Sequence, residues 1–139
     1  LIRELELTDN IIWHDGYVSQ ELVDCYFYAS DAALLPYTKI YQSGVVLMAM
    51  SYGIPVIASD LAGMREVIVH ERNGLLFPQG DAAGLAEIME RTVRDGALAG
   101  ALGREGREHV KTHHDWKTIG GKTLDFYRNV LDHDHAPQG

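Results

Sequence analysis

Ser43 and Gly44 open the most apolar helix that the sequence predicts, and this corner could bind an anion. Ser43 is a preferred N-cap residue, and Gly44 lets another backbone come close. The first N–H groups of a helix lack intrahelical partners and lie at the positive end of its dipole, so they bind phosphate well. The preceding Tyr41 and Gln42 belong to a polar, aromatic loop. An ordinary helix cap has the same pattern, so both interpretations stay open at this point.

Gly63 and Glu66 lie in a second loop, which follows a strand that ends near Ser59. Gly63 predicts an unusual backbone conformation beside a cleft. Glu66 falls in the first turn of a short helix predicted over Met64–Val69, where the helix dipole stabilises a carboxylate. A hydrogen bond from Glu66 to a sugar hydroxyl is the functional alternative to this structural role.

Two histidine-containing motifs near the C-terminus have the residue types of metal ligands. They are His113-His114-Asp115 and His133-x-His135. Adjacent residues of a helix point about 100° apart, and the second motif falls in a polar tail. Neither motif has the spacing of a closed metal site, so we predict no metal site in this chain.

The stretch from Ser43 to Ser59 must position the first loop. Val45–Met50 is apolar on every side, which predicts a helix that is buried all round. Gly53 predicts the left-handed conformation that ends this helix, and Pro55 prevents its continuation. The run Pro55–Ala58 is short, apolar and β-branched, as a central strand of a parallel sheet requires.

Three more apolar runs predict strands, at Asn10–His14, Ala32–Leu35 and Leu75–Phe77. Because the runs are continuously apolar and do not alternate, they predict a parallel sheet with helices on both faces. The predicted fold class is therefore α/β, a Rossmann-like sheet in three layers. Ligands of such sheets bind at the carboxyl ends of the strands, which here are the loops Tyr37–Gly44 and Ser59–Gly63.

Helices are predicted between these strands and over the C-terminal half. The helix capped by Ser19 has an apolar face formed by Leu22, Cys25, Tyr26 and Ala29. A second helix follows the N-cap Asp81, and the last two span Leu98–His113 and Trp116–Leu131. The Leu98–His113 helix is intrinsically weak, because each of its glycines costs up to about 1 kcal/mol relative to alanine. We expect one partial domain over residues 1–132 and a disordered tail over residues 133–139.

The overall composition restricts the class of protein. The chain has 139 residues, of which 46% are hydrophobic and 23% charged, as in an ordinary globular domain. Its net charge of -8 argues against a general nucleic-acid surface. The single cysteine excludes an internal disulfide, and no apolar run approaches the ~20 residues of a membrane span. We expect a cytoplasmic protein, with the inner face of a membrane as the alternative location for a longer chain.

Five short segments keep a fixed order within the stretch from Asn10 to the Trp116 helix. They are Gln42-Ser-Gly-Val, the apolar helix, Tyr52-Gly-Ile-Pro-Val-Ile-Ala-Ser-Asp, Gly63-x-x-Glu66 and Asn73-Gly-Leu-Leu-Phe. Together they resemble the C-terminal, donor-binding domain of family-four retaining glycosyltransferases of the GT-B fold. The resemblance implies an enzyme that transfers a hexosyl group from a nucleotide-diphosphate sugar to an acceptor, with retention and without a metal cofactor.

The resemblance also implies where the donor binds. Its diphosphate would lie near the N-terminus of the apolar helix, against Gln42, Ser43, Gly44 and Val45. Ser43 occupies a position that is usually glycine in this family, and its hydroxyl can donate to a phosphate oxygen. Tyr41 is the fifth candidate donor-binding residue, with Gly63 and Glu66 in the second loop. The resemblance identifies no catalytic residue and no acceptor, and it leaves the sugar and the base of the donor open.

Two glutamates that are typical of this family are absent from the sequence. Their positions, eight residues apart, hold Ile40 and Met48. Neither side chain can accept a hydrogen bond from a hydroxyl. Either the chain belongs to a divergent branch that contacts the donor through Tyr41 and Gln42, or its site no longer supports turnover. We favour the divergent branch, because the loop is still small and polar where a phosphate would lie.

The sequence also lacks two strand–helix units that precede the position of Asn10 in this family and carry a basic pair for the leaving diphosphate. In the usual strand order 3-2-1-4-5-6, Asn10–His14 would be the third strand and Ala32–Leu35 the fourth. The missing strands would lie between them, so we expect no pairing of these two segments. We also expect no catalysis by this chain alone, which would need an N-terminal domain or a swapped copy of itself.

Two other functions remain open at the level of the sequence. The chain could be a non-catalytic binding or scaffold module that retains the glycosyltransferase fold, as the two missing glutamates would allow. It could also be an unrelated nucleotide-binding domain of the doubly wound class. Nucleotide binding separates these alternatives.

Overall fold

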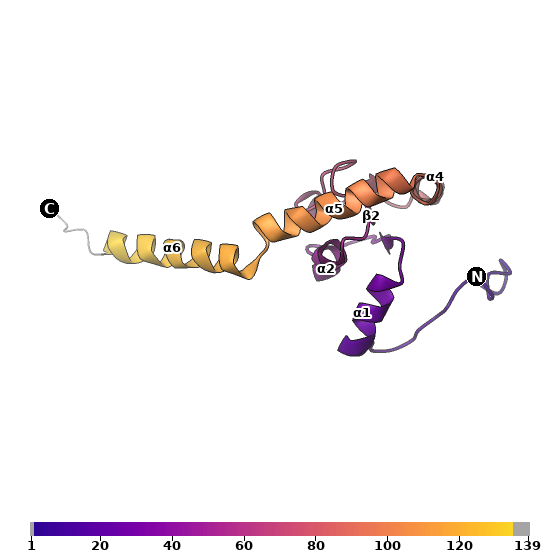
Figure 1. Cartoon of the computed structure of the whole chain (residues 1–139), viewed down its shortest axis with the longest axis horizontal. Helices are drawn as coiled ribbons and strands as arrows, with labels where there is room; N and C mark the ends of the chain where they lie inside the picture. The colour runs from indigo at the N-terminus through magenta and orange to yellow at the C-terminus, as the bar shows by residue number, and fades with distance from the viewer. Residues whose placement is uncertain (1, 135–139) are drawn as a thin grey trace.

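Three parallel strands form the sheet of the computed structural model, which describes residues 2–134 and their side chains through Leu131 (Figure 1). The strands are β1 (Ala33–Leu35), β2 (Val56–Ser59) and β3 (Leu75–Phe77), in the order β1-β2-β3. Ile57 of the central strand lies opposite Leu34 on one side and Leu75 on the other. The predicted parallel α/β fold is confirmed, with every residue of β2 buried.

Six helices are described along the chain. They are α1 (Gln20–Tyr28), α2 (Gly44–Tyr52), α3 (Ala62–Arg65), α4 (Ala82–Arg94), α5 (Gly96–His113) and α6 (Trp116–Asp134). The signals at their ends act as predicted: Gly53 closes α2 in the left-handed region with φ 77°, and Asp81 accepts a hydrogen bond from Gly84 N at 2.9 Å. The short helix α3 begins before the predicted Met64 and ends at Arg65.

Helices cover both faces of the sheet, as the layered architecture requires. On one face, Val56 and Ala58 of β2 pack with Val46 and Met50 of α2. On the other face, Ile57, Leu75 and Phe77 pack with Leu102 of α5 and with the partly buried side of α4. Because side chains of β2 point alternately to the two faces, one short strand joins both halves of the core.

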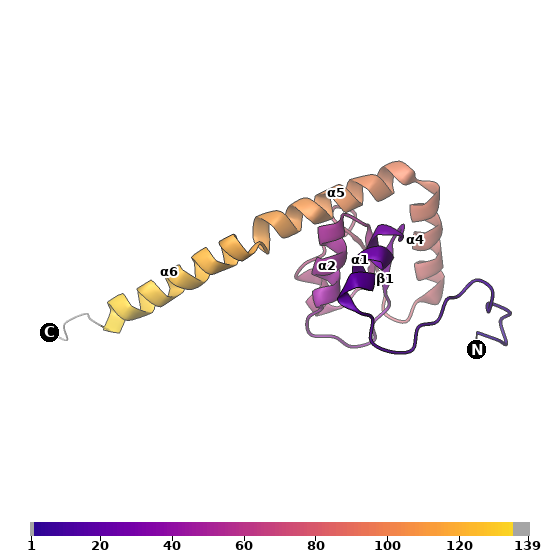
Figure 2. The same cartoon turned by 60° about the horizontal axis from the view of Figure 1, so that its bottom comes forward.

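Helix α5 lies directly against α2, backbone to backbone (Figure 2). A β-carbon built on Gly103 would overlap the carbonyl oxygen of Gly53. One turn later, a β-carbon on Gly106 would lie 3.2 Å from Cγ of Met50 and 3.3 Å from the carbonyl oxygen of Asn73. These glycines lower the intrinsic stability of α5, but they allow the close packing that holds it.

The predicted strand Asn10–His14 is wrong, because residues 10–14 form no strand and no pairing with β1. Ile12 is 86% exposed and Trp13 is 73% exposed. A strand needs a hydrogen-bonded neighbour, and this segment pairs with none of the described strands. The expectation that it does not pair with β1 agrees with the structure, and β1 therefore has one free edge.

Two predictions about helix faces are also wrong. Helix α2 is not buried all round, since Val45 and Met48 lie on an exposed side. Helix α1 has no buried residue, and its predicted apolar face, Leu22, Cys25, Tyr26 and Ala29, is exposed. The face of α1 that meets α2 instead uses Phe27, which stacks on Tyr52 with ring centroids 4.8 Å apart. The Tyr52 hydroxyl also donates a hydrogen bond to Asp24 of α1.

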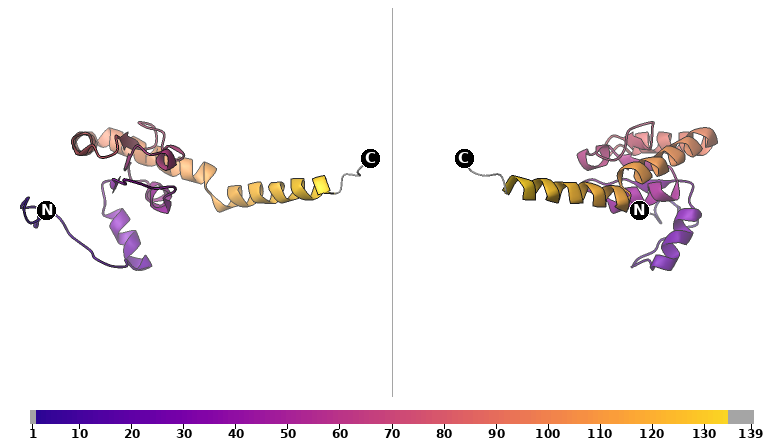
Figure 3. Two further views of the ribbon diagram at one scale, coloured as in Figure 1. Left: turned by 180° about the vertical axis from the view of Figure 1, so that it is seen from behind. Right: turned by 60° about the vertical axis from the view of Figure 1, so that its left-hand side comes forward.

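Helix α6 follows α5 end to end and projects away from the body of the molecule (Figure 3). It carries a series of exposed apolar side chains, including Trp116, Phe126 and Tyr127. The helix runs to Asp134, two residues into the predicted tail of residues 133–139, and residues 135–139 lie outside the described residues. No helix in the described part of the chain is long and apolar enough to cross a membrane.

The close contact of α5 and α2 can be tested by substituting Gly103. We expect Gly103→Ala to lower the free energy of unfolding by about 2 kcal/mol, because the added methyl group must push two backbones apart. The measurement is urea unfolding followed by circular dichroism. Gly120→Ala in α6 is the matched control, since its β-carbon meets nothing within 4 Å. The control should gain about 0.5–1 kcal/mol from helix propensity. Equal stability changes in the two variants would contradict the contact.

Candidate functional site

An open cavity of about 330 Å³ lies at the N-terminus of α2. Apart from three apolar residues, its lining comes from the loop before α2 and the first residue of α2, from α3 and its C-cap, and from the end of α5. These residues are Gln42, Ser43, Gly44, Gly63, Glu66 and His114. The apolar residues Val46, Leu47 and Val67 complete the wall. The cavity therefore lies where the carboxyl ends of the strands lead into their loops, as predicted for a parallel sheet.

The first turn of α2 presents backbone N–H groups without a side-chain cap. Ser43 occupies the N-cap position with φ -134° and ψ 110°, but its hydroxyl makes no capping hydrogen bond. A β-carbon built on Gly44 would meet nothing within 4 Å, so the space beside it is open. The N–H groups of this turn have no intrahelical acceptor. This arrangement can bind an anion such as a phosphate group.

The structure brings five of the seven predicted site residues together in this cavity. They are Gln42, Ser43, Gly44, Gly63 and Glu66. Tyr41 and Val45 do not line the cavity. Tyr41 is 94% exposed in the loop before α2, and Val45 lies on the exposed side of that helix.

The space next to Gly63 explains this glycine better than its backbone conformation does. Gly63 lies within α3, so the predicted unusual backbone is wrong. A β-carbon at this position would overlap the carbonyl oxygen of Tyr41. Gly63 therefore allows the second loop to contact the first, which closes one side of the cavity.

Polar contacts hold the loops at the ends of the three strands together. Gln79 Nε2 donates to the carbonyl oxygen of Thr38 at 2.7 Å, and the N–H of Asp60 donates to the carbonyl oxygen of Phe77 at 2.7 Å. Arg65 donates to both carboxylate oxygens of Asp60, at 2.5 and 2.8 Å. The hydrogen bonds from Arg65 lower the pKa of the Asp60 carboxyl below its ordinary value. The ion pair of Asp60 and Arg65, in the loop after β2 and in α3, therefore keeps its charges at neutral pH.

The structural role predicted for Glu66 is wrong. Glu66 is the C-cap of α3 and not part of the first turn of a helix. At the C-terminal end of a helix the dipole does not stabilise a carboxylate. The side chain is exposed and lines the cavity, so it faces any molecule that binds there. The hydrogen bond to a hydroxyl group is the interpretation that its position favours.

Ile40 and Met48, which replace the two family glutamates, do not line the cavity. Ile40 packs against the core beneath the loop. Met48 lies on the exposed side of α2. Among the described residues that line the cavity, Glu66 is the one carboxylate.

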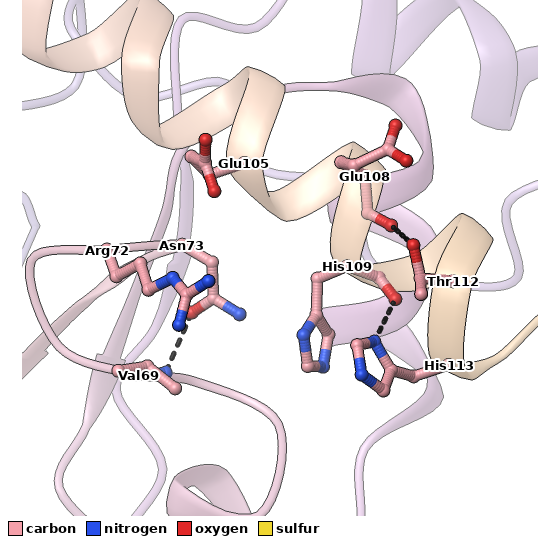
Figure 4. Close-up of a pocket in the computed structure, with 8 residues that line it drawn as sticks. All are labelled: Val69, Arg72, Asn73, Glu105, Glu108, His109, Thr112 and His113. Atoms are coloured by element: carbon pink, nitrogen blue, oxygen red, sulfur yellow. Dashed lines mark hydrogen bonds between the residues drawn. The ribbon is translucent and has the colours of Figure 1, made fainter.

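A second open cavity of about 390 Å³ lies between the loop before β3 and the C-terminal half of α5 (Figure 4). Its lining includes Arg72, Glu105, His109 and His113. The rings of His109 and His113 stack with centroids 4.6 Å apart, and His114 lies 5.5 Å from His109. His109 is not among the predicted site residues, although its i,i+4 spacing from His113 places both on one helix face.

These histidines do not form a closed metal site. In the part of the chain that the structure describes, no group of three or more His, Cys, Asp or Glu residues could hold a metal ion. The motif His133-x-His135 extends beyond the described residues. Within the described structure, Nε2 of His109 is buried and has no hydrogen-bonding partner. Burial lowers the pKa of His109, and the neighbouring His113, His114 and Arg72 lower it further.

The lowered pKa of His109 predicts a loss of stability in acid. The unfolded chain takes up this proton at the ordinary histidine pKa, about 6.5, while the folded chain resists it, so folding weakens as the pH falls through that value. We expect the thermal midpoint to fall less between pH 7.5 and 5.5 in His109→Phe than in the unsubstituted protein. Above about pH 7.5 the difference between the thermal midpoints of the two proteins should no longer change with pH. If the thermal midpoints of the two proteins fall by the same amount down to pH 5.5, this role of His109 is refuted.

The contact between the two loops can be tested with a pair of glycine substitutions. We expect Gly63→Ala to lower the free energy of unfolding by about 1–3 kcal/mol, because the methyl group collides with the Tyr41 carbonyl. Gly44→Ala should leave stability unchanged or slightly raised, since its β-carbon enters open space. Thermal unfolding followed by circular dichroism measures both. A Gly63→Ala protein as stable as Gly44→Ala would show that the loops can separate freely.

Comparison with known proteins places this chain in a family. Residues 1–95 match the family model described as Glycosyl transferases group 1. The chain is 26% identical over 123 residues to a glycogen synthase of Mycobacterium tuberculosis, which covers 88% of this chain and 30% of that protein. It thus spans about a third of the length of such relatives.

Two solved structures share the fold of this chain. Sucrose-phosphate synthase from Thermosynechococcus elongatus superposes with a TM-score of 0.85 and 31% identity, over 94% of this chain and 33% of that one. The Anabaena protein HepE, in complex with UDP-glucose, superposes with a TM-score of 0.83 and 22% identity, over 92% of this chain and 35% of that one. The HepE comparison supports the fold alone. Since the family model covers more than half of its residues, the chain belongs to the group 1 glycosyl transferases, the family that its sequence motifs resemble.

Proposed function

We propose that this chain is the donor-binding part of a glycosyltransferase that moves a hexosyl group from a nucleotide-diphosphate sugar to an acceptor with retention. The observation that carries the proposal is the uncapped N-terminus of α2, which opens into a cavity beside Gly44. Backbone N–H groups fixed at a helix start can stabilise the negative charge of a leaving diphosphate without moving. Membership of the group 1 family supports a transferase as the context for this site.

The bound nucleotide of a structural neighbour supports the same class of donor. HepE has been solved with UDP and with UDP-glucose. By analogy, the diphosphate of the donor would lie against Ser43 and Gly44, and a sugar hydroxyl could donate to Glu66. Gln42 also lines the cavity and would add a contact, while the exposed Tyr41 would have to move from solvent to reach the donor.

The proposal extends to the reaction conditions. Because retention in such a site depends on electrostatic stabilisation by the protein, we propose that the chemical step needs no metal ion. The acceptor would be a glycan, a lipid or a small molecule held by an N-terminal domain or by a swapped copy of the chain. We propose that the reaction takes place in the cytoplasm, in line with a chain that has one free cysteine, Cys25.

A non-catalytic binding or scaffold module is the second candidate function. The observation that favours it is the replacement of two family glutamates by Ile40 and Met48, of which one packs into the core and the other faces solvent. The two functions differ in what a nucleotide does. A transferase binds a nucleoside diphosphate and turns over its sugar conjugate, whereas a scaffold module of this kind does neither.

The proposed donor site can be tested with Ser43→Glu. We expect this change to weaken the binding of UDP, GDP or ADP at least tenfold, because a carboxylate then competes for the first N–H groups of α2. Isothermal titration calorimetry of each nucleotide in turn measures the effect. The same affinity with added EDTA is the expected result if no metal takes part.

Ser51→Glu is the matched control for this experiment. Ser51 is exposed at the opposite end of the same helix, so the substitution adds the same charge far from the cavity. Nucleotide affinity should stay within about twofold of the unsubstituted protein. If none of the three nucleotides binds the unsubstituted protein, the donor-binding proposal is wrong and the scaffold function is favoured.

A further inference from the structure

We propose that His114 binds the diphosphate of the donor, as the group that faces the N-terminus of α2 from the end of α5. This inference rests on the proposed function, and it adds a residue that sequence analysis considered only as a metal ligand. His114 lines the same cavity as Ser43, Gly44 and Glu66, although it lies far from them in the sequence.

The packing of α5 on α2 brings His114 to this place. The two helices meet where Gly103 touches Gly53 at the C-terminal end of α2. From Gly103 to His114, α5 rises by ~16 Å, and from Gly53 back to Gly44 the length of α2 is ~14 Å. Helix α5 crosses α2 at this contact and continues past it, and its C-cap His114 lines the same cavity as Ser43 and Gly44 at the start of α2.

The chain changes direction at His114, which fixes the residue at a joint. His114 is the C-cap of α5, and its N–H donates to the carbonyl oxygen of Val110 at 2.8 Å. The next residue, Asp115, accepts a hydrogen bond from the N–H of Lys117 at 3.0 Å and so begins α6. Helices on both sides of the joint fix the backbone of His114, and its side chain lies at the cavity wall.

The side chains that line the cavity offer few positive charges to a bound phosphate. Among the described residues that line this cavity, His114 is the one side chain that can carry a positive charge, and Glu66 carries a negative one. Lys39 lies in the loop before α2, but it does not line the cavity. A diphosphate brings at least two negative charges, and a hydrogen bond from a cationic side chain would add to those from the α2 N–H groups. The His114 ring can donate an N–H to a phosphate oxygen on the side opposite α2.

The surroundings of the ring separate this role from that of the neighbouring histidine. His114 is tilted against His109 with ring centroids 5.5 Å apart, and His109 in turn stacks on His113. His113 lines the other cavity, together with Arg72 and Glu105 (Figure 4). Two adjacent histidines therefore face different cavities, and they offer a matched pair for substitution.

The test compares two replacements of His114 that keep different properties of the ring. His114→Phe keeps a planar ring without a hydrogen-bond donor, and His114→Gln keeps a donor without the ring. We expect His114→Phe to weaken UDP binding by about tenfold, the effect of one lost hydrogen bond to a charged group. His114→Gln should retain most of the affinity. Titration calorimetry with UDP, and with uridine as the phosphate-free probe, measures both; uridine affinity should not change.

The control variant is His113→Phe, and separate outcomes would overturn the inference or the proposed function. His113→Phe should leave UDP affinity within about twofold, because that ring faces the other cavity. If His114→Phe binds UDP as tightly as the unsubstituted protein, the inference is overturned and the proposed function stands. If His114→Gln loses as much affinity as His114→Phe, or if uridine binding falls equally, the ring is structural and the inference is also overturned. If the unsubstituted protein binds no UDP, GDP or ADP, the proposed function fails, and the inference with it.

Discussion

The structure depends on the contact between the backbones of α5 and α2 at Gly103 and Gly53. No side chain separates the two helices there, so α5 can reach the sheet with Leu102 and still pack closely against α2. The same helix supports the loop before β3 through Gly106 and carries His114 to the cavity. The low helix propensity of these glycines is therefore offset by packing between helices that are distant in the sequence.

The elements set by local signals could be predicted from the sequence. Gly53 and Pro55 define the end of α2, Asp81 caps α4, and the apolar run of β2 is buried in the centre of the sheet. The errors lie where an element needs a distant partner. The Asn10–His14 segment has strand composition but no neighbouring strand, and α1 shows its predicted apolar face to solvent. Periodicity shows which face is apolar, but it does not show what covers that face.

The candidate site could also be predicted only in part, because some of its features depend on residues distant in the sequence. The rule for parallel sheets places the loops correctly, and five of the seven expected residues share one cavity. The causes assigned to Gly63 and Glu66 were wrong, because one depends on a carbonyl oxygen across the loop and the other on where α3 ends. His114 was missed as a lining residue of this cavity, since only the tertiary packing of α5 on α2 brings residues so distant in the sequence to one cavity.

Helix α6 begins directly after His114. The position of α6 and the binding of a molecule in the cavity can therefore influence each other. If α6 docks on another surface, the docked angle of α6 sets the orientation of the joint and thus of the histidine at the cavity wall. The occupancy of the cavity and the docking of α6 are then linked equilibria, and the linkage must be reciprocal. A molecule held between α2 and α5 would change the affinity of α6 for its surface by the same factor by which that surface changes the affinity for the molecule.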